Sequence, residues 1–233
     1  MNPTAAFRAR LAATLGRLGA LLLRRRRPAE VRLPAVRGPH AILALSLAGL
    51  DEIADTAAPE RAFITLRDLQ EKLTQAIAWH NGTVVAQDGA GLSATMNAVE
   101  AMNAARAVLR RIADLNRQRR LLRLSPIGIA LGLHHGTVTT GQVGARAMAL
   151  GAAMTQAERL ARLATEHDAR LIASSAFIQA LRAEGADLNS AIADLTPMPG
   201  VAAGQLLFML PRAEGVAAPR IVLPEAAERP TLH

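Results

Sequence analysis

The sequence predicts an α+β fold, with a sheet and helices on one of its faces. Two kinds of stretch alternate along the chain. In one, apolar and polar residues alternate as in strands, and in the other, apolar residues recur every three to four positions as in helices. Glycine-containing turn signals join neighbouring strand stretches into antiparallel hairpins. The chain has 233 residues, 51% of them hydrophobic and 20% charged, so it is long enough to bury one sizeable core.

The first predicted elements are a buried strand and a long helix. Residues 41–47 read Ala-Ile-Leu-Ala-Leu-Ser-Leu, an apolar run typical of a buried strand, and the Pro-containing residues 34–39 before it predict a linker. The helix that follows carries a stripe of apolar residues at helical spacing, namely Phe63, Leu66, Leu69, Leu73 and Ile77.

A hairpin and a second long helix come next. The dipeptide Asn81-Gly82 turns the chain into a strand at residues 83–85, and residues 88–91 (Asp-Gly-Ala-Gly) predict a hairpin tip before a strand at 92–96. A helix over about 97–117 has its inward face formed by Met102, Ala105, Leu109, Ile112 and Leu115. Positive charge gathers at the end of this helix, where it suits the helix dipole.

A strand with one very small face opens the second half. After Ser125-Pro126, apolar residues from Ile127 onward alternate with Gly128, Ala130 and Gly132. Gly136 is a second turn signal, so residues 137–143 are predicted to pair back as a hairpin.

The last predicted elements complete a domain over residues 41–211. A helix over about 152–165 buries Met154, Ala157, Leu160 and Ala164. A short strand at 171–173, a short helix capped by Ser174 or Ser175 and a strand at 205–210 follow. Residues 1–40 are predicted to be a basic segment with a linker, and 212–233 a loose Pro- and Ala-rich tail.

Positive charge is concentrated before the domain. The net charge is +8, and residues 1–40 alone hold nine arginines and one acid, Glu30. The other residues therefore share 18 basic and 18 acidic side chains, so the pI of about 11.5 does not describe the domain.

The N-terminal segment has an apolar stripe at helical spacing, formed by Phe7, Leu11, Leu15, Leu18 and Leu22. Its arginines interrupt every window long enough to span a bilayer, and no secretory cleavage pattern is present. One interpretation of residues 1–28 is an amphipathic helix on an anionic membrane surface, at the inner face of the membrane of a cytoplasmic protein. A frayed basic tail is the alternative, because Gly16 and Gly19 weaken the helix.

Composition excludes several classes of function. The chain has no cysteine, which excludes disulfides, thiolate metal sites and cysteine nucleophiles. It has no tyrosine, and aromatic residues make up 2%, which argues against a nucleic-acid partner bound by base stacking.

One segment resembles a known family. Residues 127–144 read Ile-Gly-Ile-Ala-Leu-Gly-Leu-His-His-Gly-Thr-Val-Thr-Thr-Gly-Gln-Val-Gly. This segment is similar to the central hairpin of class III adenylate/guanylate cyclase catalytic domains, I-G-I-x-x-G-x-H-x-G-x-V-x-x-G-x-[IV]-G. Residues 147–161 resemble that family's Y-T-x-I-G-D-x-V-N-x-A-x-R-L-E, and the likeness covers about 41–211.

The resemblance implies a ferredoxin-like βαββαβ sheet and a head-to-tail dimer. Two sites at the dimer interface of such proteins convert a purine triphosphate to its 3′,5′-cyclic monophosphate and pyrophosphate. Two Mg²⁺ or Mn²⁺ ions, held by two aspartates, activate the 3′-hydroxyl and the leaving group. A lysine and an Asp or Thr read the base, and an Asn and an Arg hold the ribose and the transferred phosphoryl group.

Both metal-ligand positions differ from the family pattern. The first aspartate opens a D-I-x-G-F segment that matches residues 46–50, so its position holds Ser46. The second lies in a K-x-x-G-D-G segment that matches residues 86–91, so its position holds Ala90. Neither side chain supplies the anionic oxygen that these cations prefer.

The nucleotide-binding positions differ as well. The base-reading lysine corresponds to Ala86 and the second base-reading position to Met148. The family Asn is replaced by Thr155, and only the arginine is retained, as Arg159. Arg159 is also consistent with a solvated helix arginine, beside a Glu158–Arg162 pair at i, i+4 spacing.

Three further side chains are of types that can bind a metal ion. Asp88, two residues before Ala90, is the surrogate that would have to replace a missing aspartate. His134 and His135 are adjacent on a strand and point to opposite faces, so the sequence predicts a packing role for His134 and no metal site.

The sequence predicts a catalytically degenerate cyclase homology domain without a cofactor of its own. We expect it to act as a dimerisation or regulatory module, as a homodimer or as a heterodimer with another cyclase homology domain. A divergent active cyclase using Asp88 is one alternative. A small-molecule sensor is the other, with an apolar ligand against the small face of Gly128, Ala130 and Gly132 in the vestigial dimer cleft.

Overall fold

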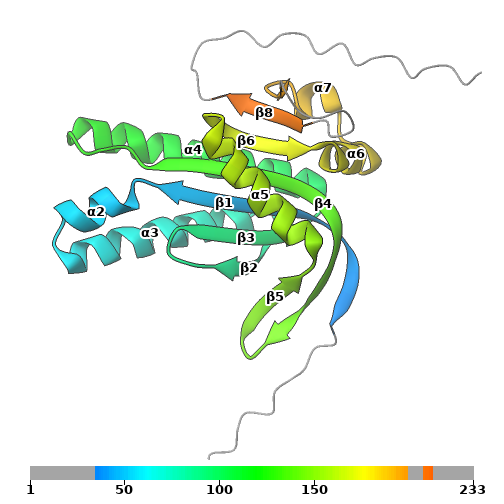
Figure 1. The fold of residues 1–233 in the computed structure, drawn as a ribbon, viewed down its shortest axis with the longest axis horizontal. Helices are drawn as coiled ribbons and strands as arrows, with labels where there is room; N and C mark the ends of the chain where they lie inside the picture. Colours follow the sequence, from blue (N-terminus) through cyan, green and yellow to red (C-terminus); the bar gives the residue numbers. More distant parts are fainter. Residues whose placement is uncertain (1–34, 199–206, 212–233) are drawn as a thin grey trace, which may run out of the picture. The chain divides into compact units, whose positions relative to one another are not determined.

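A computed structural model describes residues 35–198 and 207–211 of the chain (Figure 1). The chain divides into two units, 1–33 and 34–233, and every described residue belongs to the second. The predicted N-terminal amphipathic helix and the predicted tail at 212–233 lie outside the described residues.

The described residues form one mixed sheet. Its strands run in the order β2-β3-β1-β4-β6-β8-β7, and β5 pairs only with β4. The β4–β6 pair is parallel and the other pairs are antiparallel. The strands are β1 (Val36–Ala48), β2 (Thr83–Gln87), β3 (Gly91–Met96), β4 (Gly128–Val143), β5 (Arg146–Leu150), β6 (Ala169–Ser174), β7 (Thr196–Pro197) and β8 (Leu207–Pro211).

Helices cover both faces of the sheet, which differs from the predicted single face, although the α+β class is confirmed. Helices α3, α4 and α6 bury their apolar faces in the largest hydrophobic cluster. Helix α5 packs against the opposite face, together with Ile42 and Ala44 of β1 (Figure 1). The helices are α2 (Leu50–Thr56), α3 (Pro59–Ala78), α4 (Ala98–Leu121), α5 (Ala152–Glu166), α6 (Ser175–Ala183) and α7 (Leu188–Ala191).

The predicted inward faces of α4 and α5 are largely confirmed. Ser174 caps α6, as one of the two predicted alternatives, because its Oγ accepts a hydrogen bond from the backbone N–H of Phe177. The stripe of α3 is buried only in part: Leu69, Leu73 and Ile77 are buried, but Phe63 is 75% exposed. Phe63 lies near the start of α3, where the helix neighbours the short α2 rather than the sheet.

Strand β1 begins at Val36 rather than at residue 41, so the predicted linker is largely strand. Residues 36–40 pair with β4 only, because β3 joins β1 from Ala41 onward. This part of β1 is therefore a sheet edge, where a proline such as Pro39 is tolerated although it has no N–H to donate.

The predicted turn at Gly136 is wrong. Strand β4 runs without a break for 16 residues, and its hairpin partner is β5, reached through a turn at Gly144 with φ +62°. Glycine serves close packing at position 136, since a Cβ there would lie 2.8 Å from the Cβ of Ala153 in α5. Turn glycines and packing glycines look alike in a sequence, and only the position of α5 distinguishes them.

The small face of β4 is filled by α5. A Cβ on Gly132 would lie 2.1 Å from the carbonyl oxygen of Ala157 and 2.5 Å from the backbone N of Ala161. These atoms belong to the helix backbone, which cannot move aside as a flexible side chain can. Beside Gly132, the predicted apolar ligand space is therefore occupied by α5, whereas Gly128 lines a pocket at the start of β4.

We expect Gly132→Ala to destabilise the domain by about 2 kcal/mol or more, because the added methyl group meets helix backbone. Gly89→Ala is the matched control, since a Cβ at position 89 meets no atom within 4 Å. It should change stability by less than about 0.5 kcal/mol. Urea unfolding followed by circular dichroism measures both, and equal midpoints for the two variants would contradict the close contact.

Candidate functional site

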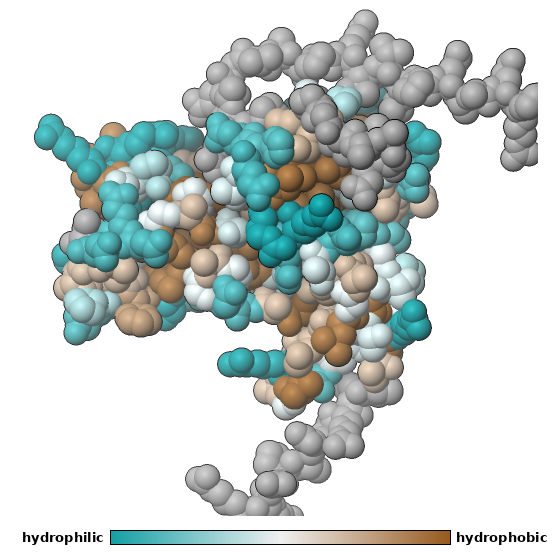
Figure 2. Space-filling view, viewed as in Figure 1, coloured by the Kyte–Doolittle hydropathy of each residue, from teal (hydrophilic) through white to brown (hydrophobic). Residues whose placement is uncertain are grey.

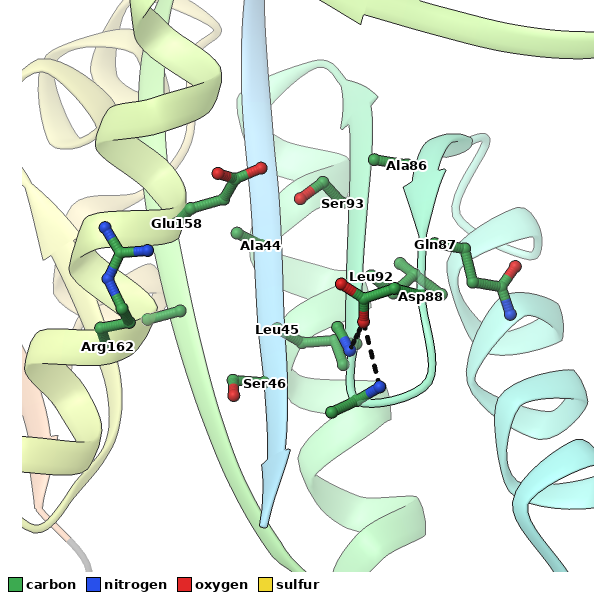
Figure 3. A pocket seen from close by; sticks show the side chains of 13 residues that line it. Ala44, Leu45, Ser46, Ala86, Gln87, Asp88, Leu92, Ser93, Glu158 and Arg162 are labelled. Atoms are coloured by element: carbon green, nitrogen blue, oxygen red, sulfur yellow. Dashed lines mark hydrogen bonds between the residues drawn. The ribbon is translucent and has the colours of Figure 1, made fainter. Parts of the chain in front are cut away.

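A pocket of about 290 Å³ opens beside the β2–β3 hairpin (Figure 3). Three elements line it: α5 and the hairpin lie on either side, and β1 lies between them (Figure 3). We call it the hairpin pocket. Its lining residues are Ala44, Leu45, Ser46, Ala86, Gln87, Asp88, Ala90, Gly91, Leu92, Ser93, Glu158, Ala161 and Arg162.

The structure brings the two predicted metal-ligand positions together. Ser46 pairs in register with Gly91, and the backbone N–H of Leu47 donates a 2.7 Å hydrogen bond to the carbonyl oxygen of Ala90. Ser46 and Ala90 therefore line the same pocket from adjacent backbones. Ser46 is half-buried and contributes a hydroxyl group, whereas Ala90 contributes a methyl group.

Asp88 shapes the hairpin turn with its carboxylate. Its Oδ1 accepts hydrogen bonds from the backbone N–H groups of Ala90, at 3.0 Å, and Gly91 (Figure 3). Gln70 of α3 holds the turn from outside, donating from Nε2 to the carbonyl oxygen of Asp88 at 2.7 Å. Oδ1 of Asp88, the predicted surrogate metal ligand, is thus already an acceptor for two backbone N–H groups of its own turn.

The predicted nucleotide-binding positions fall in two places. Ala86 lines the hairpin pocket, and Met148 lies on β5, which contacts β2, with 38% of its surface exposed. Thr155 and Arg159 are exposed on α5 and do not line the hairpin pocket. A single chain therefore gathers Ser46, Ala86 and Ala90 but leaves the other positions on a separate surface.

Two charged side chains of the pocket were not predicted as site residues. Glu158 and Arg162 extend from α5 toward β1 and β3 (Figure 3). The predicted ion pair between them is not formed, since no such contact within 4.0 Å is found among the described side chains. Their i, i+4 spacing does place both on one helix face. The packing of α5 on β4 decides which face of the helix lines the hairpin pocket, so the sequence alone did not identify these two residues.

The donor set of the hairpin pocket does not fit a pair of divalent cations. Two such ions are usually bridged by carboxylates, which supply hard anionic oxygens. Ser46 and Ala90 supply no charge here, and Asp88 already accepts two backbone N–H groups. Within residues 35–198 and 207–211, no group of three or more His, Asp or Glu side chains could hold a metal ion.

His134 joins the sheet to α6 through a side-chain hydrogen bond. Its Nδ1 lies 2.8 Å from Oγ of Ser174, the cap of α6. Burial lowers the pKa of His134, and the neighbouring His135 lowers it further. The predicted packing role is thus extended by a polar contact with Ser174, while burial and His135 favour the neutral imidazole.

Solved structures similar to this chain are cyclase domains. The adenylyl cyclase CyaB from P. aeruginosa superposes with a TM-score of 0.59 at 16% identity, covering 78% of this chain and 98% of that one. The guanylyl cyclase Cya2 gives 0.56 at 18% identity, covering 80% and 100%. The guanylyl cyclase domain of the RhoGC fusion protein from the aquatic fungus Blastocladiella emersonii gives 0.60 at 14% identity, covering 76% and 96%.

These similarities establish the fold. The chain has the fold of adenylyl and guanylyl cyclase catalytic domains, in agreement with the resemblance of residues 127–144. At sequence level, neither a scan of protein-family models nor a search of curated proteins finds a match. None of the helices in the described part of the chain is both long and apolar enough to cross a membrane.

The environment of His134 predicts acid-sensitive stability. Because the folded state lowers the pKa of His134, the unfolded chain binds the proton more readily. Stability is therefore full above the unfolded pKa of about 6.5 and falls as pH drops through the lower folded value. Urea unfolding at pH 7.5 and 5.0 should show a loss that is smaller in His134→Gln. The exposed His167 offers a control, since His167→Gln should leave the loss of stability between the two pH values unchanged. If His167→Gln reduces that loss as much as His134→Gln does, the acid sensitivity does not come from the environment of His134.

Proposed function

We propose that this chain is a non-catalytic cyclase homology domain that serves as a dimerisation or regulatory module in cyclic-nucleotide signalling. One observation carries the proposal: the two positions that hold metal-binding aspartates in the family motifs lie together in one pocket and are occupied by Ser46 and Ala90. The chain has the cyclase fold, which supports a retained scaffold with changed side chains at these two positions.

The missing groups are those that the reaction depends on. A triphosphate brings about four negative charges, which metal ions neutralise while they activate the attacking hydroxyl. The charged residues lining the hairpin pocket are Asp88, Glu158 and Arg162, which leaves an excess of negative charge. Without divalent cations, two of these groups repel the polyphosphate.

A divergent active cyclase would need Asp88 as its metal ligand. Asp88 does line the hairpin pocket, which is the observation in favour of this alternative. Its hydrogen bonds to Ala90 and Gly91 weigh against it, because metal binding through Oδ1 would compete with the turn. For the sensor alternative, α5 occupies the space beside Gly132, so an apolar ligand does not fit against that part of the small face of β4.

An exposed apolar surface supports association with a second cyclase homology domain. Large apolar side chains gather on the β4–β5 hairpin, where Figure 2 shows hydrophobic surface. Val143 and Leu150 are each 66% exposed and Met148 is 38% exposed. Exposed apolar clusters of this kind mark interaction sites. The partner is a second copy of the chain or another cyclase homology domain.

The proposal includes a place for the N-terminal segment. Residues 1–28 carry seven arginines and no acid, and the stripe from Phe7 to Leu22 has helical spacing. A segment of this composition is attracted to anionic lipid. We place the protein in the cytoplasm, with this segment at the inner face of the membrane.

Purified protein incubated with ATP or GTP and Mg²⁺ or Mn²⁺ should release no cyclic nucleotide above the buffer control. The absence of both carboxylates predicts a rate on the order of 10⁴-fold or more below that of an active cyclase domain assayed in parallel. Liquid chromatography with mass detection provides the measurement. Cyclic product that disappears in Asp88→Ala would establish the active alternative instead.

A double variant checks the assignment of the metal positions independently of turnover. Ser46→Asp with Ala90→Asp places two carboxylates on adjacent backbones in the hairpin pocket. We expect this variant to bind Mn²⁺ in a titration followed by electron paramagnetic resonance, with no binding by the unsubstituted protein. Failure of a folded double variant to bind Mn²⁺ would show that the two positions do not form a metal site.

Self-association should depend on the β4–β5 hairpin. We expect the full chain to sediment as a dimer at micromolar concentration, and Leu150→Asp to weaken that dimer at least tenfold by placing a charge in apolar contact. Leu122→Asp is the matched control, since Leu122 is similarly exposed, at 70%, but lies elsewhere. Equal sedimentation of the two variants would exclude this surface.

A further inference from the structure

A second, larger pocket lies where β1 ends and β4 begins, just beyond the β1 residues that line the hairpin pocket. It has a volume of about 600 Å³ and shares no lining residue with the hairpin pocket. We call it the arginine pocket. Its lining residues are Ala48, Gly49, Leu109, Ile112, Ala113, Asn116, Arg117, Arg120, Pro126, Ile127, Gly128, Ile129 and Arg170.

The wall of the arginine pocket is built in place. The side chain of Asn116 in α4 makes two hydrogen bonds to Ile127, donating from Nδ2 to its carbonyl oxygen and accepting its backbone N–H at Oδ1, each at 2.8 Å. Arg119 donates from Nε to the carbonyl oxygen of Ser125. These contacts join the end of α4 to the start of β4, so the pocket does not depend on a loose loop.

The charges facing this pocket have one sign. Three charged side chains line it, Arg117, Arg120 and Arg170, and none of the described lining residues is acidic. Arg117 pairs with Asp114 at 3.2 Å, on a surface where both side chains are largely exposed. Arg120 and Arg170 have no ion pair among the described residues.

Arg170 carries the strongest signal. Its Nε is buried and has no hydrogen-bond partner among the described residues, where it is the one such side-chain atom. A buried donor of a charged group without an acceptor costs free energy, and in most proteins a partner or a bound molecule relieves that cost. A guanidinium group presents its donors in a planar fork that matches carboxylate and phosphate oxygens.

The floor of the pocket is apolar. Leu109, Ile112, Ile127 and Ile129 line it, and each is less than 9% exposed. A small inorganic anion would leave this surface unused. A pocket of this size with a few convergent polar groups is typical of sites for small organic molecules.

We propose that the arginine pocket binds a small amphipathic oxyanion, a carboxylate or phosphate group attached to a short apolar body. The anionic group lies against Arg170 and Arg120, and the apolar body lies on the floor formed by α4 and β4. The inference rests on residues outside the hairpin pocket and does not depend on the proposed function. A chain with an active site would carry the same arginine pocket.

The test compares octyl phosphate and octanoate with two incomplete probes, inorganic phosphate and octanol, by isothermal titration calorimetry on the full chain. We expect at least one of the two amphipathic anions to bind, each incomplete probe to bind at least tenfold more weakly, and the stronger anion to identify the preferred head group. Absence of binding by both anions at millimolar concentration would overturn the proposal, as would equal binding of octanol.

Variants locate the bound anion. Arg170→Gln should weaken binding at least tenfold, whereas Arg111→Gln, on the same α4 helix that lines the pocket but not among its lining residues, should leave it unchanged. Without ligand, Arg170→Met should keep or raise the melting temperature, since it removes a buried unpaired donor. Binding that survives Arg170→Gln would overturn the proposal, and so would a melting temperature lowered by several degrees in Arg170→Met, because the side chain would then have a structural role.

Discussion

The backbone contact between α5 and β4 is the constraint on which the described fold depends. At Gly132 the helix approaches so closely that no side-chain atom fits, and Gly136 meets Ala153 in a similar way. This approach brings Glu158, Ala161 and Arg162 over β1, where they form one wall of the hairpin pocket. The same contact therefore fills the space that a ligand could have used and creates the pocket that holds the two metal-ligand positions.

In the hairpin pocket, the groups that hold the turn in place are different from the side chains at the two proposed metal-ligand positions. The hydrogen bonds that hold the turn involve backbone groups, the carboxylate of Asp88 and the amide of Gln70, and none requires an aspartate at position 46 or 90. With Ser46 and Ala90 at the two proposed metal-ligand positions, the register of β1 and β3 is regular. The absence of aspartates there also avoids two like charges that would repel each other on adjacent backbones without a cation between them. The proposed absence of the metal site therefore conflicts with no hydrogen bond of the turn.

Much of this fold could be predicted from the sequence, because periodicity reports which face of an element is buried. The strand at residues 41–47, the hairpin tip at 88–91 and the helix at 152–165 all occur where the pattern places them. The predictions were wrong where a residue type is common in two different structural settings. Glycine at position 136 packs rather than turns, and Pro39 lies in an edge strand rather than a linker. Alignment with the family motifs identified Ser46 and Ala90 as site positions. Glu158 could not be identified in this way, because only the packing of α5 on the sheet brings it to the hairpin pocket.

The arginine pocket could not be predicted at all, because its residues come from separate segments that only the folded sheet brings together. Residues 41–233 have balanced charge, so no net field attracts an anion to them. What the fold does is local: it places arginines from α4 and β6 around an apolar floor and keeps carboxylates away from the lining. Such an arrangement costs stability as long as the Nε of Arg170 lacks an acceptor. An oxyanion that accepts a hydrogen bond from this Nε removes the penalty, and the gain adds to the free energy of binding. An unpaired buried donor is therefore stronger evidence for a ligand than a surface cluster of arginines is.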